Sequence, residues 1–155
     1  MTKLSKSLLE FVKKPNIGIL ATLRKDGSPH LTAVWYLYEK DEVWISITDG
    51  RMKYKHFSRD PRVSLAVAGV ALPYKEVVFE GTAEISHEGG DDFFRRVAIY
   101  YYGDKDGNRY ADYDSGAVKD KRLILHYRPT KIMAYDFEHE DDYHEPWGDT
   151  YQVSF

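Results

Sequence analysis

The stretch VWISITDGRMKYKHFSRDPRVSLAV, residues 43–67, decides the fold. Val43–Thr48 is rich in β-branched and aromatic residues and predicts a strand. An Asp-Gly pair ends this strand, and Arg51–Arg59 then contains no helix breaker before Asp60-Pro61. The stretch therefore predicts a strand, a short basic helix and a further strand over Arg62–Val70.

Towards the N-terminus, two β runs flank a strong turn signal. Ile17–Leu23 and His30–Tyr38 are separated by KDGSP (25–29), in which Asp-Gly and Ser-Pro both favour a turn. These runs predict an antiparallel hairpin, which the strand at Val43–Thr48 extends into a meander. Before the hairpin, apolar residues at helical spacing predict a short amphipathic helix with Thr2 as its candidate N-cap: Leu4, Leu8, Phe11 and Val12.

Towards the C-terminus, Glu76–Ser86 alternates with a period of two and predicts a long strand with one buried face. Helical spacing at Phe93 and Val97 predicts another helix, and Gly103–Gly116 is the expected mobile loop. Two last strands are predicted after it: Arg122–Tyr127 and Lys131–Phe137.

These segments amount to six or seven strands and two or three helices. Their connections are too short for the crossovers of a parallel sheet. The sequence therefore predicts a mainly β, α+β fold, a small antiparallel barrel with peripheral helices. With 155 residues, no linker and no internal repeat, residues 1–155 are expected to form a single domain.

Composition removes several classes of function. Lys and Arg number 22 against 25 Asp and Glu, and a net charge of −3 does not favour nucleic acid or an acidic membrane surface as a partner. The chain contains no Cys, which excludes disulfides, thiolate nucleophiles and Cys-based metal sites. No run approaches the ~18 apolar residues of a membrane-spanning helix, and the N-terminal residues lack a secretory signal, so we expect a cytoplasmic protein.

The densest basic cluster begins at the end of the strand Val43–Thr48. A phosphate there could bind Arg51 and Lys53, the hydroxyl of Thr48 and the free N–H groups of the helix N-terminus. Arg51 and Lys53 lie about 200° apart on a helix, so they converge only if Arg51 precedes the first turn. The alternative is a solvated basic helix face, because charged runs are usually at the surface.

Other chemistries lack the residues they need. In HEDDYHE (139–145) the two His are five apart, unlike the i, i+4 pair of a zinc helix, and DKDGN (104–108) lacks ligands of a calcium loop. No glycine-rich phosphate loop and no GxSxG motif occur. We therefore expect no metal and no hydrolytic triad, and chemistry carried by a bound organic cofactor remains open.

Three strings resemble the split β-barrel family of pyridoxamine 5'-phosphate oxidase-like proteins, in particular its flavin- and deazaflavin-dependent oxidoreductase branch. They are GILATLRKDGSPHLTAVWYLY (18–38), the stretch 43–67 and VVFEGTAEI (77–85). The resemblance implies an FMN-binding type of split barrel and a homodimer with FMN or coenzyme F420 in clefts between the protomers. An adjacent Arg-Lys pair is replaced by Met52-Lys53, and the oxidase's C-terminal arginine motif is missing, which argues against vitamin B6 oxidation.

The resemblance also implies site residues. Arg51 and Lys53 match the pair that grips the cofactor phosphate, Thr48 matches the hydroxyl beside them, and Lys55 matches an auxiliary basic position. Glu76 falls near a position that the partner chain contributes to the site. The second strand matches the stretch along the tricyclic ring: His30, Thr32, Ala33, Val34 and Trp35.

Alternation places Thr32, Val34 and Tyr36 on one side of this strand and Ala33, Trp35 and Leu37 on the other. Either Trp35 or Tyr36 could cover the ring, or Trp35 and Trp44 could be core residues. Trp147 and Tyr151 are candidates for the substrate pocket.

Taken together, the sequence predicts an oxidoreductase that passes hydride between FMN or F420 and a small organic substrate, with His30 or a Tyr as a candidate proton donor. A flavin carrier or sensor without turnover is one alternative. A haem-binding or haem-degrading protein on the same barrel is another.

Overall fold

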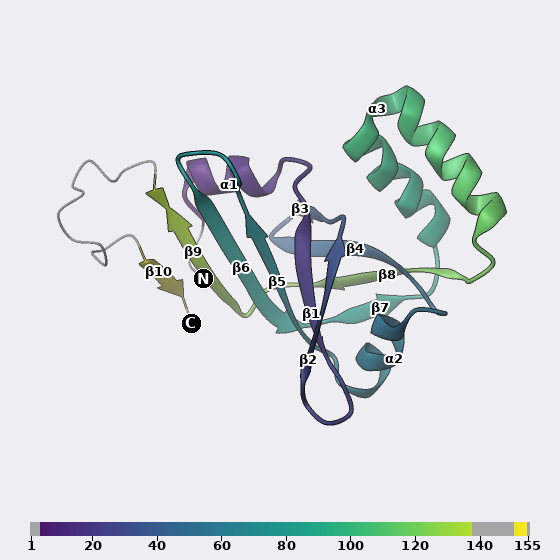
Figure 1. Cartoon of the computed structure of the whole chain (residues 1–155), viewed down its shortest axis with the longest axis horizontal. Coiled ribbons are helices and arrows are strands. Elements are labelled where there is room, and N and C mark those ends of the chain that lie inside the picture. Colours follow the sequence, from purple (N-terminus) through teal and green to yellow (C-terminus); the bar gives the residue numbers. More distant parts are fainter. Residues whose placement is uncertain (1–3, 138–150, 155) are drawn as a thin grey trace.

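The computed structural model describes residues 4–137 and 151–154, which form two antiparallel sheets and three helices (Figure 1). The larger sheet contains β1 (Gly18–Leu23), β2 (Pro29–Val34), β5 (Arg62–Ala68), β6 (Lys75–Thr82), β9 (Lys131–Asp136) and β10 (Tyr151–Ser154). Its strand order is β10-β9-β6-β5-β1-β2. The smaller sheet, of order β3-β4-β8-β7, contains β3 (Leu37–Glu39), β4 (Glu42–Thr48), β7 (Glu84–Ser86) and β8 (Arg122–Tyr127).

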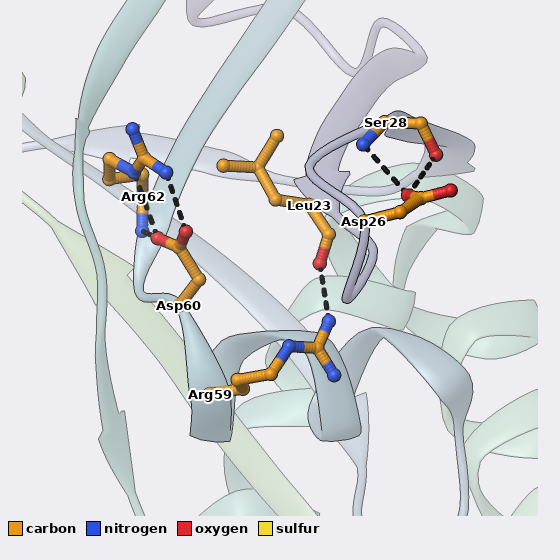
Figure 2. Close-up of polar contacts among 6 residues, drawn as sticks. All are labelled: Leu23, Asp26, Ser28, Arg59, Asp60 and Arg62. Carbon is orange, nitrogen blue, oxygen red and sulfur yellow. Dashed lines mark hydrogen bonds and ion pairs between the residues drawn. The ribbon is translucent and has the colours of Figure 1, made fainter.

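The predicted hairpin is present, and its turn has the predicted chemistry. Gly27 adopts φ +83°, a value that favours glycine, and its N–H donates to the carbonyl of Arg24 at 2.9 Å. The Asp26 carboxylate accepts from the N–H and the hydroxyl of Ser28 at 3.0 and 2.6 Å (Figure 2). The turn thus aligns β1 with β2 from Leu23↔Pro29 to Gly18↔Val34.

Two predicted strands are each divided in the structure. His30–Tyr38 becomes β2 and β3, and Glu76–Ser86 becomes β6 and β7. Each break lies where the chain passes from the larger sheet to the smaller one, at residues 35–36 and at Ala83. These crossings, together with β10, give ten strands in the described residues, so the prediction of six or seven was wrong.

The main core lies between the sheets and draws its buried side chains from both, among them Leu20, Leu65, Phe79, Ile45 and Leu125. The alternation of β6 confirms the predicted buried face. Helix α1 (Lys6–Val12) packs Leu8 and Val12 onto this core. Its N-cap is Ser5, whose hydroxyl oxygen accepts from the N–H of Leu8 at 3.2 Å; the candidate cap Thr2 lies outside the described residues.

The segment Gly103–Gly116, expected to be a mobile loop, is helical. It forms the second half of α3 (Gly90–Ala117), which is kinked at Gly103, where φ is +79°. The kink turns the second half back along the first, and the guanidinium of Arg95 bonds Asn108 Oδ1 at 3.0 Å and Asp112 Oδ1 at 2.5 Å. Ala111 is buried in this contact. The loop prediction was wrong because the polar composition and three Gly of this segment are typical of a loop. They give no sign that the segment packs along the first half of α3.

The coarse fold class is confirmed: the described residues are mainly β, with antiparallel sheets and three helices. Within those residues neither sheet closes on itself by hydrogen bonding, so the split barrel stays a prediction. Helix α2 (Met52–Arg59) packs on β1 and β4, while α3 covers β8 and β4 at the far end from β9 (Figure 1). No helix among the described residues is long and apolar enough to span a membrane.

Candidate functional site

The N-terminus of α2 meets the condition that the sequence set for a phosphate site. Arg51 is the N-cap residue with extended backbone (φ −86°, ψ 149°), and its N–H donates to the carbonyl of Thr48 at 3.2 Å. The helix begins at Met52, so Arg51 precedes the first turn and Lys53 lies within it. The first turn has no acidic residue, and in the described part of the chain no carboxylate pairs with Arg51 or Lys53 within 4 Å.

Lys53 reaches into a pocket of about 170 Å³ between α2, the end of β2, β4 and α3. Burial lowers the pKa of the Lys53 ammonium, and the charge of Arg51 lowers it further. The negative charge of a bound anion would offset both effects. The other lining residues combine apolar and hydroxyl side chains: Ala33, Val34, Trp35, Ser46, Phe94 and Val97.

Thr48, at the end of β4, carries an orphaned polar atom. Its side chain is buried at 5% exposure, and its Oγ1 has no hydrogen-bond partner. Unpaired buried hydroxyls are costly and uncommon in folded proteins. An anionic acceptor held between Thr48 and the cations of α2 would supply the missing partner, so these residues fit a phosphate group.

The structure decides which side of the second strand faces inward. His30 and Thr32 are half-buried and Val34 is buried, whereas Leu31 and Ala33 are exposed on the outer face. Thr32 Oγ1 is a further buried atom without a partner.

Trp35 and Tyr36 have different environments. Trp35 lines the pocket and stacks on Tyr101 of α3, with ring centroids 4.9 Å apart. Tyr36 enters the main core, where its hydroxyl donates to the carbonyl of Val12 at 2.9 Å. Tyr36 as a cover for the ring was therefore wrong. Trp35 and Trp44 are not main-core residues either, because both pack in the smaller cluster beneath α3.

Four of the predicted site residues line the pocket: Lys53, Ala33, Val34 and Trp35. Arg51, Thr48 and Thr32 do not line it, and the other three lie in different surroundings. The side chain of Lys55 is exposed, and the ring of His30 packs edge-on against the buried ring of His56 at 5.0 Å, where its Nδ1 has no hydrogen-bond partner. Glu76 lies on β6, three strands from β2, which is about 14 Å at ~4.8 Å per strand. Glu76 is therefore not among the residues that line this pocket within one protomer.

Several site residues were not predicted. Arg122 is the cross-strand partner of Thr48 in the β4–β8 pair, and its Nη1 lies 3.4 Å from Ser46 Oγ. Its guanidinium carbon lies 3.4 Å from the centroid of the Phe94 ring, and it forms an ion pair with Asp114. The sequence predicts a strand beginning at Arg122 but gives no signal that this strand pairs with β4.

Two further cations of the basic cluster, Arg59 and Arg62, form hydrogen bonds at the C-terminal end of α2 and just after it (Figure 2). Arg59 Nη2 donates to the carbonyl of Leu23 at 2.9 Å and ties the helix to β1. Arg62 forms two bonds to the Asp60 carboxylate at 2.9 and 2.7 Å and lowers the pKa of Asp60 to about 2. Arg62 is thus neutralised, whereas neither Lys55 nor Arg59 forms an ion pair among the described residues.

A comparison with known protein families identifies the family of this chain. The pyridoxamine 5'-phosphate oxidase family model matches residues 4–135. The chain therefore belongs to this family, and the resemblance noted in the sequence is confirmed.

Solved structures agree with the assignment. An F420 reductase is 25% identical with a TM-score of 0.66, over 85% of this chain and 98% of that one. A conserved hypothetical protein from Mycobacterium tuberculosis is 28% identical with a TM-score of 0.71, over 96% and 94% of the two chains. A FAD-binding protein from Mesorhizobium loti shares the fold at 19% identity and a TM-score of 0.61, over 84% and 94%.

Proposed function

We propose that this protein is an oxidoreductase that binds FMN or F420 in a homodimer of split barrels and transfers hydride to or from a small organic substrate. The observation that carries the proposal is the orphaned Thr48 hydroxyl beside Arg51 and Lys53, two cations without a carboxylate partner in the described chain. A phosphate group offers both the acceptor and the negative charge that these side chains lack.

The neighbouring pocket supports the ring of such a cofactor. Its wall combines the backbone at the end of β2 with the aromatic face of Trp35, a combination suited to a flat group with a polar edge. When bound, the flavin or deazaflavin supplies the hydride chemistry. The protein's part is to hold the anionic end at α2, orient the ring along Ala33 and Val34, and exclude water with Phe94 and Val97.

The homodimer is supported by the outer face of the larger sheet. At the β2 edge this face exposes Ile19 (41%) and Leu31 (62%), and Ala33 lies directly opposite Ile19 in the register. Apolar side chains exposed together on one sheet face are typical of a subunit interface. A second copy on this face would cover them and would turn the open pocket beside Ala33 into a cleft between protomers.

Fluorescence titration with FMN and with F420 tests the cofactor proposal. Arg51→Ala and Lys53→Ala should each weaken binding at least tenfold, because a charge-assisted hydrogen bond contributes ~1.5–3 kcal/mol. Lys105→Ala, which removes an exposed cation from α3, is the matched control and should leave affinity unchanged. Affinities within about twofold of wild type for both site variants would refute the phosphate site.

Turnover separates this function from the alternatives. The reduced cofactor should be oxidised in the presence of the protein and a member of a panel of small planar acceptors. Tight cofactor binding without turnover on any acceptor would favour a carrier or sensor. Failure to bind either cofactor, with a Soret band after addition of haem, would favour the haem-binding alternative.

A further inference from the structure

We infer that Arg122, with Asp114 as its positioning partner, is a third cation of the anion-binding site and contributes to recognition of the ligand's phosphate end. This inference rests on the proposed function and assigns a role there to a residue outside the basic cluster. It starts from the strand register, since Arg122 and Thr48 are directly opposed in the β4–β8 ladder. Directly opposed residues project from the same face of a sheet, so Arg122 shares a face with the orphaned hydroxyl.

The Arg122 guanidinium contacts two residues that line the pocket, while Arg122 itself lines a neighbouring pocket together with Asp91, Asp92 and Asp120. Its Nη1 lies 3.4 Å from Ser46 Oγ, and its central carbon lies 3.4 Å from the centroid of the Phe94 ring. Ser46 and Phe94 line the same pocket as Lys53. The cation–π contact holds the guanidinium against the Phe94 ring.

Charge in this region is unbalanced. Burial lowers the pKa of Arg122, the charge of Asp91 raises it, and the charge of Arg51 lowers both this pKa and that of Lys53. Asp114 is the one carboxylate of the described residues that forms an ion pair with any of these three cations. A phosphate monoester of charge about −2 would balance the charges of Arg51 and Lys53. Its oxygen atoms would also accept hydrogen bonds from the Arg122 guanidinium.

The ion pair between Arg122 and Asp114 also explains how the guanidinium is held. Their side chains are 10% and 13% exposed, and Asp114 comes from the second half of α3, which the kink at Gly103 folds back along the first half. A guanidinium has five N–H donors, so one carboxylate does not exhaust them. Arg122 can keep Asp114 and still donate to an anion.

The test compares affinities for FMN and for riboflavin, which lacks the phosphate. In the double variant Arg122→Gln/Asp114→Asn, which leaves no unpaired buried charge, FMN affinity should fall about tenfold while riboflavin affinity changes less than about twofold. Asp114→Asn alone keeps the cation but removes the carboxylate that positions it, so FMN affinity should fall by a smaller factor than in the double variant, with riboflavin affinity unchanged. If wild type prefers F420, the same comparison uses F420 and the phosphate-free deazaflavin.

A purely structural ion pair gives a different result. FMN and riboflavin would then lose affinity by the same factor in the double variant, and this would overturn the inference. If the double variant does not fold, Arg122→Lys takes its place in the test. This variant retains the charge, so its affinity for FMN should fall less than in the double variant, and its affinity for riboflavin should not fall. An unchanged FMN-to-riboflavin ratio in the Arg122 variants, with a reduced ratio in Arg51→Ala, would reject only this inference. No binding of either FMN or F420 by wild type would reject the proposed function as well.

Discussion

The hydroxyl of Thr22 and Nδ1 of His56 lie 2.8 Å apart in a buried hydrogen bond that joins β1 to α2. His56 is only 4% exposed, and its ring also packs edge-on against His30. The groups whose charges act on it are His30, Arg59 and Arg24, all basic. The helix that carries Lys53 is therefore held against the sheet by an imidazole whose surroundings oppose protonation.

This environment predicts a loss of stability in acid. Burial, with help from His30 and the two Arg, lowers the pKa of His56 below its ordinary value of 6.5. Below pH 6.5 the unfolded chain therefore binds more protons at this residue than the folded protein does, and the free energy of unfolding decreases as the pH falls towards the folded pKa. Urea unfolding at pH 7.5 and 5.5 should show this decrease in wild type.

His56→Gln removes the titrating group and should reduce the difference between the two pH values. His87→Gln, at an exposed position, is the matched control and should behave as wild type does. Equal acid sensitivity of wild type and His56→Gln would contradict the assignment.

Two glycines of α3 predict opposite effects of the same substitution. A Cβ at Gly103 or at Gly116 would meet no atom within 4 Å, so the effect depends on the backbone alone. Gly103 has φ +79°, and Gly103→Ala should cost about 1 kcal/mol. Gly116 is helical, and Gly116→Ala should stabilise by about 0.5–1 kcal/mol. Thermal unfolding of both variants checks the kink, and a shift of the same sign in both would argue against it.

The proposed homodimer predicts a response to charge on the outer sheet face. Leu31→Arg places a cation in the apolar patch and should shift the protein to a monomer in analytical ultracentrifugation, with loss of cofactor affinity. Leu72→Arg, at a leucine that is 76% exposed between β5 and β6, is the control and should remain dimeric. A Leu31→Arg protein that stays dimeric would show that this face is not the interface.

Trp35 is predicted to recognise the ring and not the phosphate. Trp35→Leu should weaken FMN and riboflavin by the same factor, about two- to tenfold, because an aromatic pair contributes ~0.5–1.5 kcal/mol. Titration of both ligands measures this factor, and a loss confined to FMN would place Trp35 at the anionic end instead.

The sequence predicted the local parts of the fold well because their signals are local. The helix at residues 52–59 and the hairpin before it follow from breakers and turn residues that act within a few positions. Convergence of Arg51 and Lys53 was predicted on one condition, and the extended backbone of Arg51 meets it. The assignment of phosphate chemistry to this pair still awaits the binding experiment.

What the sequence could not predict depends on pairing between distant segments. Arg122 adjoins Thr48 only because β8 pairs with β4, a contact across 74 positions that no local pattern encodes. The helical second half of α3 was missed for the same reason, because Ala111 and Asp114 acquire partners only after the chain reverses at Gly103. The strand count failed where a continuous β pattern in the sequence spans a change of sheet, at residues 35–36 and at Ala83.

The passage from β2 to β3 takes only residues 35 and 36, and these two point to opposite sides, one to the pocket and one to the core. Deleting or inserting a single residue here would exchange those sides and shift the pairing of one sheet against the other. The connection at 69–74 joins strands of the same sheet and carries no such constraint. Length variation among homologues should therefore accumulate at that connection and be absent from the crossing, a pattern that an alignment can check.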